Sequence, residues 1–153
     1  MNNPQIFNAG DIALDVVKHA PDAIIVADRQ GTVRVWNPGA ERVFGFSAAE
    51  AVGRSLDLII PEKYRNAHWA GWRRMLQVGS SRYGAADLLS VPGQHSDGRR
   101  LSLEFSVFPI QDAVGEIIGI GTILRDVTQR FEEEKVLKRR LAELEAARWA
   151  GNA

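Results

Sequence analysis

The stretch that decides the fold is residues 23–45, AIIVADRQGTVRVWNPGAERVFG. Residues 23–28 are rich in β-forming side chains, and residues 32–37 mostly alternate between apolar and polar types. The turn Arg29-Gln30-Gly31 separates these two segments, and strands joined by a short turn containing glycine predict a β-hairpin. Asn37-Pro38 then has the order of a helix cap followed by a first helical residue. This part of the chain is therefore predicted to run strand, turn, strand, helix.

Helices are predicted on both sides of the hairpin. The segment before it is amphipathic, with Asp11 as its expected N-cap. After the hairpin, Ser47 and Glu50 have the spacing of a capping box. A longer helix carries apolar side chains at spacings of three and four between Pro61 and Gly79. The predicted helical segments are residues 11–20, 38–44, 47–53 and 62–78.

The pattern changes to a period of two in the second half of the chain. Strands are predicted near residues 89–91, 101–107 and 116–125. The side chains expected to face inward along the clearest of these strands are Leu101, Leu103, Phe105 and Val107. Five strands with helices inserted after the second predict an α+β fold, with one antiparallel sheet and helices packed on one face. We expect a pocket between the sheet and the helix 62–78.

Composition excludes several classes of site and partner. The chain has 153 residues and no cysteine, and 19 Lys+Arg balance 19 Asp+Glu. Without cysteine there is no disulfide, thiolate metal site or flavin–cysteinyl adduct. Zero net charge argues against nucleic acid or an anionic membrane as a partner. With no bilayer-spanning stretch and no secretion signal, we expect a cytoplasmic protein. No nucleophile elbow or phosphate loop is present, so we expect a binding module and not an enzyme.

Three stretches together resemble the PAS sensor-domain family. They are residues 21–56, residues 95–110 (HSDGRRLSLEFSVFPI) and residues 119–130 (GIGTILRDVTQR). The resemblance covers about residues 14–130, and it implies the PAS fold and a sensory or dimerising module. The expected organisation is a flexible N-terminus at 1–9, a PAS sensor domain at 10–128 with a flanking helix at about 10–20, and a C-terminal linker helix at 129–153.

A narrower resemblance lies within the long helix. Residues 59–74, IIPEKYRNAHWAGWRR, are similar to the helix that carries the iron-ligating histidine in FixL-type haem PAS oxygen sensors. The resemblance implies that His68 is the proximal ligand of haem b and that Arg74 lies near a haem propionate. Such a site also needs apolar walls and a cation at its mouth. Suitable wall residues are Leu101, Leu103, Phe105 and Val107.

The resemblance also indicates the gas-binding side. FixL-type sensors have an arginine there, and an alignment on Asp97-Gly98 places Leu88 or Leu89 at that position in this chain. We therefore expect an apolar gas-binding side in which Leu89 contacts the cofactor. The implied function is detection of a diatomic gas (oxygen, carbon monoxide or nitric oxide) or of redox state.

Other functions remain open at the level of sequence. Without the resemblance, His68 is explained as an ordinary surface or hydrogen-bonded helix histidine. The domain is then a cofactor-free dimerisation module, or it holds another small ligand such as a flavin or a fatty acid. Near the C-terminus, Leu137, Leu141 and Leu144 form an apolar stripe. We expect this stripe to contribute to a homodimer, and the helix to pass the signal to a downstream signalling domain or partner protein.

Overall fold

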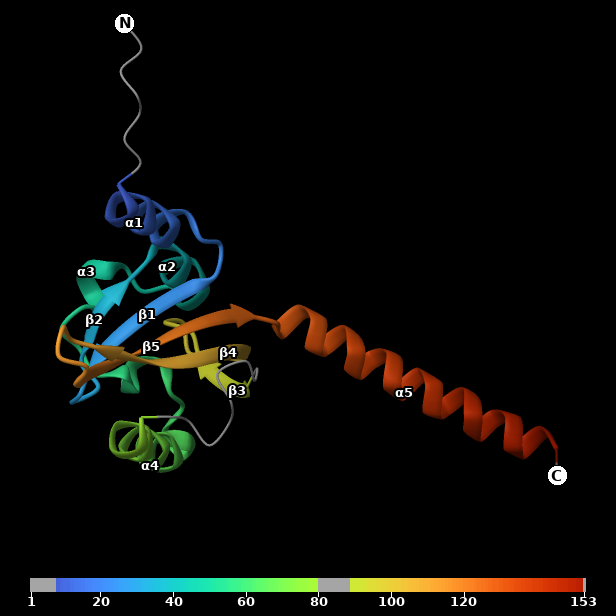
Figure 1. Cartoon of the computed structure of the whole chain (residues 1–153). Helices are drawn as coiled ribbons and strands as arrows, with labels where there is room; N and C mark the ends of the chain where they lie inside the picture. The colour runs from blue at the N-terminus through green and yellow to red at the C-terminus, as the bar shows by residue number, and fades with distance from the viewer. Residues whose placement is uncertain (1–7, 80–88, 153) are drawn as a thin grey trace, which may run out of the picture.

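The computed structural model describes residues 8–79 and 89–152 of the chain (Figure 1). These residues form one five-stranded sheet, five α-helices and a short 3₁₀ helix. In chain order the elements are α1 (Ala9–His19), β1 (Ala23–Asp28), β2 (Val33–Trp36), α2 (Pro38–Phe44), α3 (Ala48–Ala51), η1 (Leu56–Ile59), α4 (Glu62–Val78), β3 (Leu89–Gln94), β4 (Arg100–Gln111), β5 (Ile117–Asp126) and α5 (Thr128–Gly151).

The strands form one sheet in the order β2-β1-β5-β4-β3. All neighbouring strands in it are antiparallel, as the sequence predicts. The last strand, β5, lies at the centre, where it pairs with β1 on one side, for example through Leu124 and Ala23, and with β4 on the other. The hairpin β1–β2 and the hairpin β3–β4 therefore occupy the two edges, with β5 joining them (Figure 1). The predicted strand at residues 23–28 has the bounds that the structure gives to β1.

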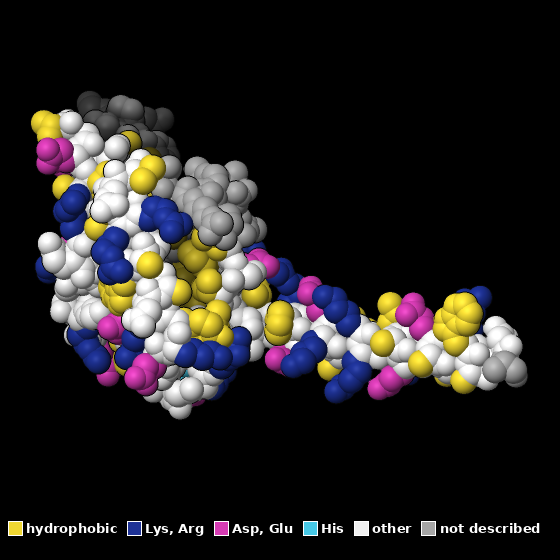
Figure 2. Space-filling model, turned by 90° about the horizontal axis from the view of Figure 1, so that it is seen from below, with side chains coloured by type: hydrophobic (Ala, Val, Ile, Leu, Met, Phe, Trp, Pro, Cys, Tyr) yellow, Lys and Arg dark blue, Asp and Glu magenta, His cyan; other side chains and the backbone are white. Residues whose placement is uncertain are grey.

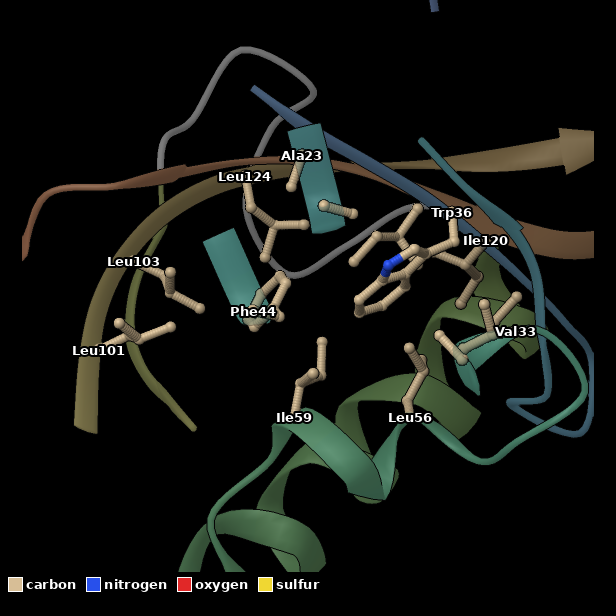
Figure 3. Close-up of a cluster of buried hydrophobic side chains, with 14 of the residues drawn as sticks. Ala23, Val33, Trp36, Phe44, Leu56, Ile59, Leu101, Leu103, Ile120 and Leu124 are labelled. Atoms are coloured by element: carbon tan, nitrogen blue, oxygen red, sulfur yellow. The ribbon is translucent and has the colours of Figure 1, made fainter. Parts of the chain in front are cut away.

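The core lies between the sheet and the helices that follow β2. Figure 3 shows Phe44 of α2 and Ile59 of η1 directed toward Leu103 and Leu124 of the sheet. Phe44 is fully buried, and Trp72 and Met75 bring α4 into the same core. Burial of these apolar side chains is the main favourable contribution to folding. The predicted layer of helices is confirmed for α2 and α4, and η1, which was not predicted as a helix, contributes to the same core.

Helix α1 differs from the prediction in its start and in its packing. Asp11 is not the N-cap, because the helix begins at Ala9 and the side chain of Asn8 accepts a hydrogen bond from the N–H of Gly10 at 2.9 Å. The added first turn satisfies backbone donors that a start at Asp11 leaves to water. The helix contains no buried residue and lies beside α2. It therefore stands apart from the main helical layer.

The junction between β5 and α5 is tied to the start of β4. The N–H of Val127 donates to the carbonyl of Ser102 at 2.9 Å, and the N–H of Ser102 donates to the Thr128 hydroxyl at 2.9 Å. In the next turn, Arg130 forms an ion pair with Glu104. Beyond this anchored turn α5 extends away from the domain, and its residues are not buried (Figure 1).

None of the helices within residues 8–79 and 89–152 is long and apolar enough to cross a bilayer.

Candidate functional site

A cavity of about 650 Å³ lies between α4 and the inner face of the sheet. Its volume is in the range of sites that hold small organic ligands. Apolar side chains form most of its wall, and Figure 2 shows a hollow lined by hydrophobic side chains with Lys and Arg side chains near its edge. The predicted pocket between the sheet and the helix 62–78 is therefore present.

One face of α4 forms the first wall. The helix has the predicted bounds, since it starts after Pro61 and ends at Gly79, whose φ of +71° suits a glycine cap. Because residues three and four apart share a helix face, the lining residues recur at that spacing. The lining residues of α4 are Tyr64, Ala67, His68, Ala70, Gly71, Trp72, Arg74 and Met75.

Alternate residues of the sheet form the opposite wall. They come from β1, β3, β4 and β5, and they are almost all apolar: Ile25, Ala27, Leu89, Val91, Leu103, Phe105, Val107, Ile120 and Leu124. Thr122 contributes the only hydroxyl of the described sheet residues that line the cavity. That hydroxyl donates a hydrogen bond to the carbonyl of Ser106 at 2.8 Å, so its proton is not offered to a ligand.

His68 is a polar group on the helical wall of the cavity. The side chain is half-buried, and its Nδ1 atom is buried with no hydrogen-bond partner among the described residues. Burial lowers the pKa of His68 to about 4, and the negative charge of Asp57 acts in the opposite direction. The imidazole is therefore neutral at neutral pH, and a neutral imidazole is the form that binds metals.

Two tryptophans hold the imidazole in place. The ring of His68 lies edge-on to Trp69 at a centroid distance of 4.7 Å and tilted against Trp72 at 5.9 Å. Trp69 donates its indole N–H to the carboxylate of Asp57 at 2.8 Å, and Trp72 donates to the carbonyl of Arg29 at 3.1 Å. Both rings are thus fixed by hydrogen bonds to other elements. Trp72 lines the cavity, whereas Trp69 packs over Gly31.

Cationic side chains lie near the mouth of the cavity. Arg74 lines the cavity and is exposed. Near the other end of the helix, Lys63 lies 4.8 Å from the ring centroid of Tyr64. A hydrogen bond with Lys63, with a smaller contribution from the charge of Arg100, lowers the pKa of the Tyr64 phenol. This arrangement favours a ligand with an apolar body and one or more negatively charged groups.

The structure brings most of the sequence-predicted site residues together. The cavity is lined by His68, Arg74, Leu89, Leu103, Phe105 and Val107. Leu101 is only 1% exposed and packs in the core, but it is not among the lining residues. Leu88, the alternative to Leu89, lies outside the described residues. Sequence analysis did not select Gly71 or Tyr64 as site residues, although their spacing from His68 on one helix indicates them.

Comparison with known proteins gives the same fold. A family model described as "PAS fold" matches residues 17–132. Sensor protein FixL of Bradyrhizobium diazoefficiens is 29% identical over 124 residues, covering 81% of this chain and 24% of FixL. The signal transduction histidine-protein kinase AtoS of Escherichia coli is 29% identical over 130 residues, covering 85% of this chain and 19% of AtoS. The chain thus spans a quarter or less of these relatives.

Solved structures show the same architecture at lower identity. A PAS domain from Colwellia psychrerythraea superposes with a TM-score of 0.70 at 22% identity, covering 80% of this chain and 99% of that one. An RNA-binding light-oxygen-voltage receptor superposes with a TM-score of 0.69 at 23% identity, covering 93% of this chain and 40% of that one. At this level of identity the likeness concerns the fold alone.

Proposed function

Because this chain belongs to the PAS family, we propose that it is a haem b-binding sensor domain that responds to a diatomic gas or to redox state. Its relatives include a sensor protein and a signal transduction histidine-protein kinase, and they support a role as a PAS sensor domain in signal transduction. The bound cofactor, the gas ligand and the output are the parts that we propose.

The observation that carries the proposal is the state of His68. No hydrogen bond within the described residues engages the buried Nδ1 of this ring, so the imidazole is not committed there to a structural partner. The lowered pKa leaves it neutral, and it faces a cavity whose walls are apolar. These are the properties that haem requires of its proximal ligand and its surroundings.

Several residues of the cavity would hold the haem. His68 would bind the iron, Leu103, Phe105 and Val107 would contact the faces of the porphyrin, and Arg74 would pair with a propionate. A haem held there supplies an iron centre that takes a diatomic ligand. The apolar sheet wall excludes water from that ligand, and Leu89 adds no hydrogen-bond donor to it.

We propose that α5 carries the signal. Leu103 lines the cavity, and the neighbouring Ser102 bonds through its backbone to Val127 and Thr128 at the start of α5. A ligand that prefers one arrangement of β4 then biases the position of the helix, since a ligand shifts an equilibrium by its differential affinity for the two states. The receiver would be a downstream signalling domain or a partner protein, and the domain itself would not be an enzyme.

A second candidate is another small ligand in the same cavity. Among the structural neighbours is a light-oxygen-voltage domain whose description names a flavin analogue, with a TM-score of 0.62 at 15% identity. A flavin in this chain would have to bind without a cysteinyl bond, because the chain has no cysteine. A fatty acid fits the apolar walls and the cationic mouth equally well in chemical terms.

The test is the absorption spectrum of the whole chain, purified and then titrated with haemin. We expect a sharp Soret band at stoichiometric binding. His68→Ala should lose the band or should depend on added imidazole for it. His19→Ala is the matched control, because His19 is an exposed histidine whose Nδ1 contacts the Asp15 carbonyl at 2.8 Å. A yellow preparation with a flavin spectrum favours the second candidate. An unchanged haem spectrum in His68→Ala excludes His68 as the ligand.

A further inference from the structure

The cavity face of α4 has an inner row and an outer row of residues. His68, Trp72 and Met75 form the inner row, where Trp72 and Met75 are buried. Ala67, Ala70, Gly71 and Arg74 form the outer row, which also lines the cavity but is exposed. These four residues therefore stand where the cavity opens, three with small side chains or none and one with a cation.

Within residues 8–79 and 89–152, no contact or backbone conformation accounts for the glycine at residue 71. It lies in the interior of α4, where glycine is less favourable than alanine by about 1 kcal/mol. Its φ is not positive, and a Cβ added there would meet no atom within 4 Å in the described part of the chain beyond the backbone of its own helix. Gly93, also at the cavity, is different, because a Cβ there would lie 2.4 Å from the side chain of Leu103.

We infer that Gly71 is a specificity-determining residue that admits a wide, flat ligand against the backbone of α4, between His68 and Arg74. The inference rests on the proposed function, since it names the part of the helix that the haem edge would contact. Gly71 is three residues after His68 and three before Arg74, so all three share one face of the helix. A planar ligand anchored at His68 and paired with Arg74 passes over Gly71.

The position of residue 71 at the mouth of the cavity should discriminate between narrow and wide ligands. A narrow acyl chain can occupy the apolar interior near Leu103, Phe105 and Ile120 without approaching the outer row. A ligand as wide as a porphyrin extends from that interior to the mouth. A side chain at residue 71 should therefore obstruct the flat ligand and spare the acyl chain.

The experiment compares Gly71→Ala and Gly71→Val with the unmodified chain. Gln77→Val is the control, because Gln77 is exposed on the same helix and does not line the cavity. The probes are haemin and dodecanoic acid, titrated separately, and the urea midpoint of the unliganded proteins is measured as well. We expect Gly71→Ala to raise the midpoint while weakening haemin binding. Gly71→Val should weaken haemin binding by about fivefold or more, as expected for overpacking, and leave dodecanoic acid binding unchanged.

The outcomes separate this inference from the proposed function. If Gly71→Val binds haemin as tightly as the unmodified chain does, the inference is wrong and the haem proposal stands. Equal losses for haemin and dodecanoic acid also overturn it, because residue 71 then does not select for width. An unmodified chain that takes up no haemin refutes the proposed function, and this inference with it.

Discussion

The side-chain oxygen of Asn37 accepts a hydrogen bond from the backbone N–H of Ile24 at 2.8 Å, which ties the start of α2 to strand β1. The same oxygen caps α2 by accepting from the N–H of Ala40 at 2.9 Å. The amide nitrogen donates to the carbonyls of Val17 and Asp22 at 2.9 and 3.1 Å. Asn37 is 3% exposed, so one side chain satisfies buried groups from three segments.

Replacement of Asn37 should therefore cost more than the loss of a cap. We expect Asn37→Ala to lower the free energy of unfolding by about 2–4 kcal/mol, since capping and buried hydrogen bonds are both lost. Asn37→Ser keeps a capping oxygen and should lose less. Urea unfolding followed by circular dichroism measures both, with Asn8→Ala at the exposed cap of α1 as the control. Equal losses in Asn37→Ala and Asn8→Ala would contradict this account.

The unliganded protein should lose stability in mild acid because of His68. Its pKa is lowered from 6.5 to about 4 by burial, so below pH 6.5 the unfolded chain takes up a proton that the folded chain refuses. Stability should therefore be full above pH 6.5 and fall progressively toward pH 4, by up to about 3 kcal/mol. His68→Gln should remove this part of the pH dependence. Matching slopes for the two proteins between pH 6.5 and 4 would show that His68 does not titrate in this way.

Leu89 should set the preference between gases in the haemin-loaded, reduced protein. Dioxygen is the more polar ligand and gains more than carbon monoxide from a hydrogen-bond donor. Leu89→Arg should therefore raise the affinity for oxygen over that for carbon monoxide by about a kcal/mol or two. Ser90→Arg on the same strand is the control, because Ser90 is exposed and does not line the cavity. Gas titrations give the ratio of the oxygen affinity to the carbon monoxide affinity. An unchanged ratio in Leu89→Arg would show that the gas does not bind beside residue 89.

The stripe on α5 should support a homodimer. Leu137, Leu141 and Leu144 are 66%, 58% and 63% exposed, which leaves their apolar surface in water in a single chain. Simultaneous replacement of the three by glutamine should shift sedimentation toward the monomer. Val136→Gln changes an exposed apolar residue of α5 outside the stripe and should leave the dimer intact. A dimer fraction that the triple change does not alter would remove α5 from the interface.

Local signals explain the accuracy of some predictions. Pro61 and Gly79 mark both ends of α4, and the period of three and four between them identifies its inner face. The capping box of Ser47 and Glu50 is likewise present, because both of its bonds lie within four residues. Such features depend only on neighbours in the chain, so a sequence is enough to place them.

Other features depend on contacts between distant segments. The pairing of β1 with β5 joins residues about a hundred positions apart, and alternation alone does not specify it. Alternation predicts that Leu101 and Leu103 both point inward, and both are buried. Leu103 nevertheless lines the cavity and Leu101 does not, which depends on how distant elements pack around the sheet. For the same reason the bonds of Asn37 to Ile24 and Val17 were not predicted, although its cap was.

The anchoring of α5 has a mechanical consequence. Its first turn is held to Ser102 of β4, and the remainder of its 24 residues has no buried contact with the domain. At a rise of 1.5 Å per residue the helix is about 36 Å long, so a tilt of about 5° at the anchor displaces the far end by about 3 Å. In the proposed role the helix would act as a lever that pivots at the sheet. A small movement of β4 can therefore displace Trp149, near the far end of α5, by about 3 Å.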